Sequence, residues 1–173
     1  MSDYELTDET VEVRGHILHR IRALRDINED VHAGDLGGFV ESTENLDASH
    51  GAWVSDNACV YGSARVYDSA WVFDNACVFD RARVYDRARV YDRGWVSGSA
   101  RVFGRACMYG DAWVSDHAWV SGNARVYGEA WVGGDARVEG HAEVCGSATI
   151  HGTDHIGGTA RIDGDVEVCE GES

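Results

Sequence analysis

Residues 82–100 read ARVYDRARVYDRGWVSGSA, and the same pattern returns in this stretch every six residues. From residue 52 onward, every position divisible by six holds Val or Ile, with Met108 as the one other residue. Ala stands two positions before it, except at Gly94, Asp154 and Val166, and Gly or Asp stands two positions after it as far as Gly164. A fixed short period is typical of a solenoid, in which each coil presents the same inward side chains to the coil below.

The repeat also predicts the shape of each coil. In residues 82–87, Ala82 and Val84 alternate with Arg83 and Tyr85, which indicates a short strand with one buried face. Asp86 then stands where a residue that tolerates positive φ can turn the chain. Three such sides of six residues make a coil of 18, so we expect an all-β fold, a single-stranded parallel β-helix (solenoid) with a triangular cross-section.

Residues 1–51 do not follow the count of six. Residues 11–13 and 17–24 predict a β-hairpin around Arg14 and Gly15, and residues 34–38 form a Gly-rich link. We expect residues 1–51 to be an N-terminal cap that covers the open end of the first coil. Residues 52–173 would then form the repeat helix, with an acidic C-terminal end.

An aliphatic residue followed four positions later by a small one resembles the hexapeptide repeat of left-handed parallel β-helices, the fold of the trimeric acyltransferases. The resemblance covers residues 52–173 and implies a left-handed winding and three-fold self-association. Those enzymes usually place Gly directly after the aliphatic residue, whereas here it follows one residue later, as in Val60-Tyr61-Gly62. A right-handed triangular helix of the bactofilin kind is therefore an alternative.

The N-terminal segment carries a second resemblance. HILHRIRALRDI at residues 16–27 and VHAGDLGGFVESTENLD at residues 31–47 look like the start of a group of phage and prophage hexapeptide-repeat proteins. Members of that group are often labelled acyltransferases because of their repeats. The resemblance implies a phage or prophage origin.

The net charge of −15 is concentrated at the two ends of the chain. Residues 1–51 carry −8, residues 52–138 are neutral, and residues 139–173 carry −7. Like charge at both ends opposes end-to-end polymerisation, and an acidic surface disfavours direct nucleic-acid binding. An acidic anti-defence or DNA-mimic protein is an alternative reading of the same charge. With no membrane span and an acidic, polar start that does not resemble a signal peptide, we expect a cytoplasmic protein.

Residues that stand one coil apart should stack into columns on the surface. One column contains Cys59, Cys77, Trp95, Trp113 and Trp131, and another contains Arg65, Arg83, Arg101 and Trp119. Stacked aromatic residues can simply stabilise neighbouring strands, but contiguous exposed apolar surface usually marks association. We therefore predict binding surfaces at these Trp and Arg residues, used for a homo-oligomer, a trimer by the resemblance above, or for another protein partner.

The Arg column has two interpretations. Its members should lie near Asp corners such as Asp68, Asp86 and Asp92, which predicts a lattice of surface ion pairs. A groove for phosphate or carboxylate groups is the alternative. Cys59 and Cys77 should stack within the reach of a disulfide, and we expect free thiols in a reducing compartment.

The six-residue repeat continues without an inserted loop, and this disfavours an enzymatic function. Hexapeptide acyltransferases need a general-base His, for which His117 and His141 are the candidates, and a loop or neighbouring subunit that holds the acyl donor. Between residues 52 and 170 no inserted loop interrupts the repeat. His117, His151 and His155 do not keep the spacing of a zinc site of the γ-class carbonic anhydrase kind.

We therefore expect no cofactor and no metal, and we predict a non-enzymatic structural or interaction protein. An acetyl-CoA-dependent acyltransferase with an inter-subunit site is the first alternative. A bactofilin-like filament is another.

Overall fold

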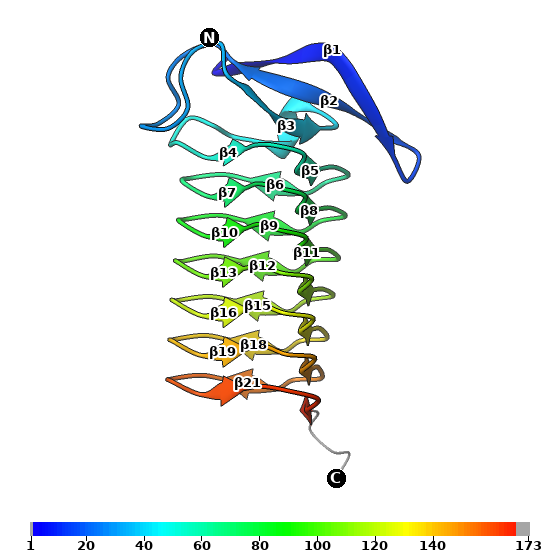
Figure 1. The fold of residues 1–173 in the computed structure, drawn as a ribbon, viewed down its shortest axis with the longest axis vertical. Helices are drawn as coiled ribbons and strands as arrows, with labels where there is room; N and C mark the ends of the chain where they lie inside the picture. Colours follow the sequence, from blue (N-terminus) through cyan, green and yellow to red (C-terminus); the bar gives the residue numbers. More distant parts are fainter. Residues whose placement is uncertain (1, 169–173) are drawn as a thin grey trace.

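The chain forms a rod of stacked triangular coils with a longer hairpin at its N-terminal end (Figure 1). The computed structural model describes residues 2–168, so residues 169–173 of the predicted acidic end lie outside it. Within residues 2–168 the strands belong to three sheets, and the one helical segment is a 3-10 turn, η1 (Thr43–Asn45). This part of the chain has no helix with the length and apolar character of a membrane span.

The strands divide among the three sides of the rod. The ten-stranded sheet contains β1 (Tyr4–Val13), β2 (His16–Ala23), β3 (Leu36–Val40), β5 (Cys59–Val60), β8 (Cys77–Val78), β11 (Trp95–Val96), β14 (Trp113–Val114), β17 (Trp131–Val132), β20 (Thr149–Ile150) and β23 (Glu167–Val168). The seven-stranded sheet contains β4 (Trp53–Val54), β7 (Trp71–Val72), β10 (Arg89–Val90), β13 (Cys107–Met108), β16 (Arg125–Val126), β19 (Glu143–Val144) and β22 (Arg161–Ile162). The six-stranded sheet contains β6 (Arg65–Val66), β9 (Arg83–Val84), β12 (Arg101–Val102), β15 (Trp119–Val120), β18 (Arg137–Val138) and β21 (His155–Ile156).

Strands of successive coils are parallel and in direct register. On the ten-stranded sheet Trp95 pairs with Trp113, the residue that the repeat predicts one coil later. On the six-stranded sheet Arg65 pairs with Arg83 at the same spacing. The predicted parallel β-helix, with three sides and this coil length, is therefore confirmed, and its left-handed winding stays a prediction.

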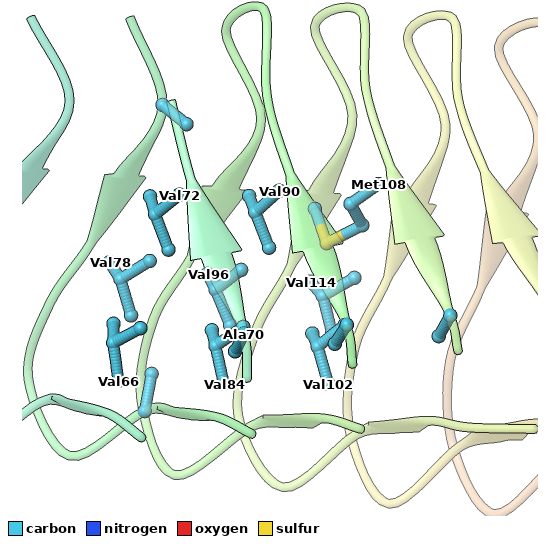
Figure 2. Packing of buried hydrophobic residues seen from close by; sticks show 14 of the residues in the cluster. Val66, Ala70, Val72, Val78, Val84, Val90, Val96, Val102, Met108 and Val114 are labelled. Carbon is cyan, nitrogen blue, oxygen red and sulfur yellow. The ribbon is translucent and has the colours of Figure 1, made fainter. Parts of the chain in front are cut away.

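The inward side chains fill the interior of the rod without a gap in the pattern. Every Val, Ile or Met at the sixth position is fully buried from Val54 to Ile150, and so is every Ala two positions before it. Figure 2 shows these residues in rows along the rod, with Met108 in line with the valines. Burial of each Val contributes about 1.5–3 kcal/mol, so the repeated pair supplies the main stabilisation of the fold.

The corners explain why Asp alternates with Gly in the repeat. In the described chain, seven corner aspartates have left-handed backbone with φ between 57° and 60°, a conformation that Asp tolerates better than most residues. The carboxylate also links coils: Asp92 Oδ2 accepts a hydrogen bond of 3.0 Å from the backbone N–H of Gly110 in the next coil. Asp80 makes the same contact with Gly98.

The N-terminal hairpin closes the upper end of the core. β1 and β2 pair antiparallel and turn at Arg14 and Gly15, as the sequence predicts. Tyr4 is buried at this end, with its ring edge-on to Trp53 at 6.3 Å between centroids. Its hydroxyl donates a hydrogen bond of 2.9 Å to the carbonyl of Leu46.

The parallel stack begins before the regular repeat. Val40 of β3 pairs with Val60, and Leu46 forms a bridge to Val66. Both contacts span a longer stretch of chain than the regular pairing of Val60 with Val78, so the first turn of the rod is longer than those below it. The division at residue 52 marks the start of the regular count and, as a domain boundary, stays a prediction.

The lower end of the rod is less well covered. Ile156, Ile162 and Val168 are only half-buried, whereas Ile150 in the coil above is fully buried. Within the described range, the apolar cross-section of the core is therefore closed by the hairpin at one end and open at the other.

Candidate interaction surface

Three tryptophans lie in a row on the ten-stranded sheet, and we name them the tryptophan strip: Trp95, Trp113 and Trp131. Direct parallel pairing places each indole one coil below the previous one. Each Trp stands between an inward small residue and an inward Val, so its side chain points away from the core. Trp113 and Trp131 are 42% and 37% exposed, which makes them two of the most exposed large apolar side chains in the described chain.

Hydrogen bonds along the rod hold the indoles of the strip in place. Trp131 Nε1 donates to Ser115 Oγ at 2.9 Å, and Trp113 in the coil above makes the equivalent contact with Ser97. Neighbouring ring centroids are 6.2 Å apart. Since the indole N–H groups of the two exposed tryptophans are paired within the chain, the strip offers apolar ring surface to a partner.

The N-terminal hairpin covers the upper part of this side of the rod. A buried cluster outside the main core joins the hairpin to the coils and consists of Leu18, Phe39, Cys59, Tyr61 and Phe79. At the hairpin tip, the Arg14 guanidinium lies 4.7 Å from the ring centroid of Trp95 and 5.2 Å from that of Phe79. The sequence predicts only an end cap, whereas the hairpin also reaches down beside the upper coils (Figure 1).

Charged residues border the strip. A small groove of about 210 Å³ lies between Trp95 and Trp113 and is also lined by Arg93 and Asp111. Arg93 and Asp111 form an ion pair of 3.5 Å, so their charges balance. One coil below, the position of Asp111 is taken by Glu129, whose side chain has no ion-pair partner among the described residues.

A second aromatic site lies on the six-stranded sheet. Trp119 is flanked by two guanidinium groups, with Arg101 at 5.1 Å and Arg137 at 5.0 Å from its ring centroid. Tyr67, Tyr85 and Phe103 form a parallel stack beside the Arg column, with centroids 5.0 Å apart. Trp119 is therefore already engaged by residues of its own chain.

The predicted lattice of ion pairs along the Arg column is wrong. Among residues 2–168, Arg65, Arg83 and Arg101 form no ion pair with a corner Asp. The corner carboxylates are instead directed along the rod, toward the backbone N–H of the next coil, as in the contact of Asp86 with Gly104 at 2.9 Å. A backbone donor at fixed distance replaces a flexible side chain as the partner of each carboxylate.

The two candidate histidines are not brought together. His117 follows β14 of the ten-stranded sheet, and His141 follows β18 of the six-stranded sheet, so they lie at different corners. Both are exposed, and His141 Nε2 lies 3.4 Å from Asn123 Nδ2. In the described chain, no three His, Cys, Asp or Glu side chains are grouped as metal ligands.

One further groove lies where the segment after the hairpin meets the coils. It has a volume of about 690 Å³ and is lined in part by Glu29, Asp30, Trp71, Arg87 and Arg89. The repeat does not predict this groove, because Glu29 and Asp30 belong to the segment before the count of six begins, whereas Trp71 and Arg89 belong to a column of the repeat. It is open to solvent and contains both signs of charge.

Comparison with known families supports the repeat architecture. Residues 82–98 and 118–134 match the model of the YdcK β-solenoid repeat. The second match begins two coils of the rod below the start of the first. Comparison with curated proteins gave no match. The chain is therefore a β-solenoid repeat protein, and the matched stretches contain Trp95 and Trp131 of the strip.

Proposed function

We propose that this protein is a non-enzymatic interaction scaffold of phage or prophage type that holds a protein partner on the tryptophan strip. The observation that carries the proposal is the exposure of Trp113 and Trp131 on a regular sheet, with their N–H groups already paired. The phage or prophage type rests on the resemblance of residues 16–47.

A rigid sheet suits this role. Trp is enriched at the energetic centres of protein interfaces, where a few aromatic residues supply most of the binding energy. The strip is positioned by strands on a packed core, so little conformational entropy remains to be lost when a partner binds. A flat side without inserted loops suits the surface of another protein better than a small molecule.

A second copy of the chain is the first partner to test. The resemblance to the trimeric acyltransferases implies a trimer, and exposed aromatic surface favours self-association. The hairpin limits how such a contact can form, because it already covers the side of the rod above Trp113. Any neighbouring copy would rest on the lower coils.

Two alternative functions, an acyltransferase and a nucleic-acid mimic, fit the surface of this protein less well. An acyltransferase would need a base beside a held substrate, whereas His117 and His141 are exposed at separate corners. A DNA mimic would need a continuous acidic surface, whereas residues 52–138 have no net charge. The interaction scaffold requires only the strip and the rod that presents it.

Light scattering of the wild type and of Trp113→Glu tests the proposal, together with the proteins that each retains from a bacterial lysate. We expect the wild type either to form an oligomer or to retain a partner, and the variant to lose that contact while it keeps its unfolding temperature. Trp119→Glu on the other sheet is the matched control. The proposal would be contradicted if the wild type were a monomer that retains no partner and both variants behaved in the same way.

A further inference from the structure

The chain itself shows one group that binds to the tryptophan strip. Arg14, at the tip of the hairpin, places its guanidinium 4.7 Å from the centroid of Trp95, at the top of the strip. A cation over the face of an indole is attracted by the negative charge of the ring. The same kind of contact recurs on the other sheet, where Trp119 is flanked by two arginines. Two tryptophans of this rod therefore already hold guanidinium groups of their own chain.

The lower two tryptophans of the strip have no such cation. In the described chain no Arg lies over the rings of Trp113 or Trp131, and both remain exposed. The groove of about 210 Å³ between Trp95 and Trp113 shares one residue, Trp95, with the contact that Arg14 makes. The lower strip thus repeats the chemistry of the upper strip but lacks its guanidinium ligand, and the ring neighbour of Trp131 on its lower side is His151, with centroids 6.3 Å apart.

Three carboxylates lie beside this lower part of the strip, and one of them, Asp111, is paired with Arg93. Asp111 lines the groove, and Glu129 takes the same place one coil below. Asp116 lies close to the ring of Trp131, since a Cβ built at Gly133 would meet Asp116 Oδ2 at 3.0 Å and Trp131 Cε2 at 3.1 Å. Carboxylates beside an aromatic face favour a cation that can contact both.

On the basis of the proposed function, we propose that the partner presents arginine side chains from a basic segment, stacked on Trp113 and Trp131 as Arg14 stacks on Trp95. Arginine fits better than lysine, because the planar guanidinium can lie flat on a ring and still donate hydrogen bonds to a carboxylate. A basic segment also suits the carboxylate of Glu129 beside the strip, which has no ion pair in the described chain, and the two acidic ends of the chain would attract it at longer range. A second copy of this acidic chain would approach against charge repulsion.

Calorimetric titration with three short peptides tests this proposal: acetyl-GRGRGRG-amide and the versions with Lys or Glu in place of Arg. We expect the Arg peptide to bind, the Lys peptide to bind several-fold more weakly, and the Glu peptide not to bind. The double variant Trp113→Ala, Trp131→Ala should weaken Arg-peptide binding about tenfold or more. Trp119→Ala is the matched control and should leave binding unchanged.

A second variant separates charge from ring stacking. Glu129→Gln should weaken binding of the Arg peptide about two- to fivefold, and added salt should reduce that difference. Absence of Arg-peptide binding at millimolar concentration, or equal binding by the double Trp variant, would overturn the proposal.

The same experiments distinguish this proposal from the proposed function. A wild-type oligomer that Trp113→Glu dissociates, and that excludes the Arg peptide, would make a second copy the occupant of the strip. In that case the scaffold function stands and the basic partner is wrong. A monomer with no peptide binding and no retained partner would contradict both.

Discussion

Trp113 Nε1 donates a hydrogen bond of 2.9 Å to Oγ of Ser97 in the coil above. Ser97 is buried, so its hydroxyl depends on this indole for a partner. We expect Ser97→Ala to lower the free energy of unfolding by about 0.5–1.5 kcal/mol and to increase the mobility of the indole. Urea unfolding and quenching of tryptophan fluorescence measure the two effects. Ser121→Ala, at the same repeat position on the six-stranded sheet, is the control, and an equal loss there would contradict the assignment.

The corner aspartates predict a ranked series of stabilities. Asp92 combines a φ of 57° with a hydrogen bond to the N–H of Gly110. Asp92→Ala removes the acceptor and keeps a Cβ in the left-handed region, so we expect a loss of about 1–3 kcal/mol. Asp92→Gly should lose less, because it relieves the backbone strain, and Asp92→Asn should lose least. Thermal unfolding of the three variants gives the order, and a Gly variant as unstable as the Ala variant would contradict it.

The repeating part of this fold could be predicted from sequence because each inward residue obeys one local rule. Val84 and Ala82 need no distant information, since their partners are the same residues one coil away. The columns follow from the same rule, and they place Trp95, Trp113 and Trp131 on one side. The sequence also contains a signal for the hydrogen bonds of the strip. The column that contains Tyr61 and Phe79 in the upper coils contains serine beside the strip, which supplies an acceptor for the indole N–H groups.

Contacts between the hairpin and the rod could not be predicted in this way. Arg14 and Trp95 are far apart in the sequence, and no period connects them. The longer offset between Val40 and Val60 likewise falls before the count of six begins. The predicted ion pairs between the Arg column and the corner aspartates are wrong for a different reason. The six-residue repeat gives the neighbours of Asp86 but not the direction in which its carboxylate points.

Acid should weaken the attachment of the hairpin. Glu41 Oε1 lies 2.9 Å from His16 Nδ1 of the hairpin, and Oε2 accepts a hydrogen bond of 2.7 Å from the N–H of Gly62. The hydrogen bond with His16 lowers the pKa of Glu41 from its ordinary value. A carboxyl whose pKa is lower in the folded than in the unfolded chain stabilises the fold above its unfolded pKa, and this contribution is lost as the pH falls through the folded pKa.

Glu41→Gln should therefore unfold at a lower temperature than the wild type at neutral pH. The difference should persist from about pH 7 to about pH 5 and shrink below that, because the wild-type carboxyl becomes protonated only as the pH falls through its lowered pKa. Melting curves across this range measure the convergence. Glu12→Gln, an exposed position on the same hairpin, is the control. A difference between wild type and Glu41→Gln that stays constant with pH would show that the ionised carboxylate contributes nothing.

Oxidation should join two neighbouring coils covalently. Cys59 and Cys77 are free thiols that pair directly on β5 and β8, where parallel strand spacing places their Cα atoms about 4.8 Å apart, inside the range of a disulfide. The hydrogen bond with Cys59 and the positive charge of Arg14 lower the pKa of Cys77, which favours the attacking thiolate. Oxidised glutathione would accept the two electrons, leaving two reduced glutathione molecules and one intramolecular bond.

The product should have lost two hydrogen atoms by mass spectrometry, and its free energy of unfolding should rise by about 2–4 kcal/mol because a loop of one coil is closed. Cys77→Ser should abolish the change and Cys107→Ser should retain it. Alkylation of the wild type after prolonged oxidation checks this prediction. If both thiols still react with the alkylating reagent, the stacked pair is held too rigidly, or too deeply, for the bond to form.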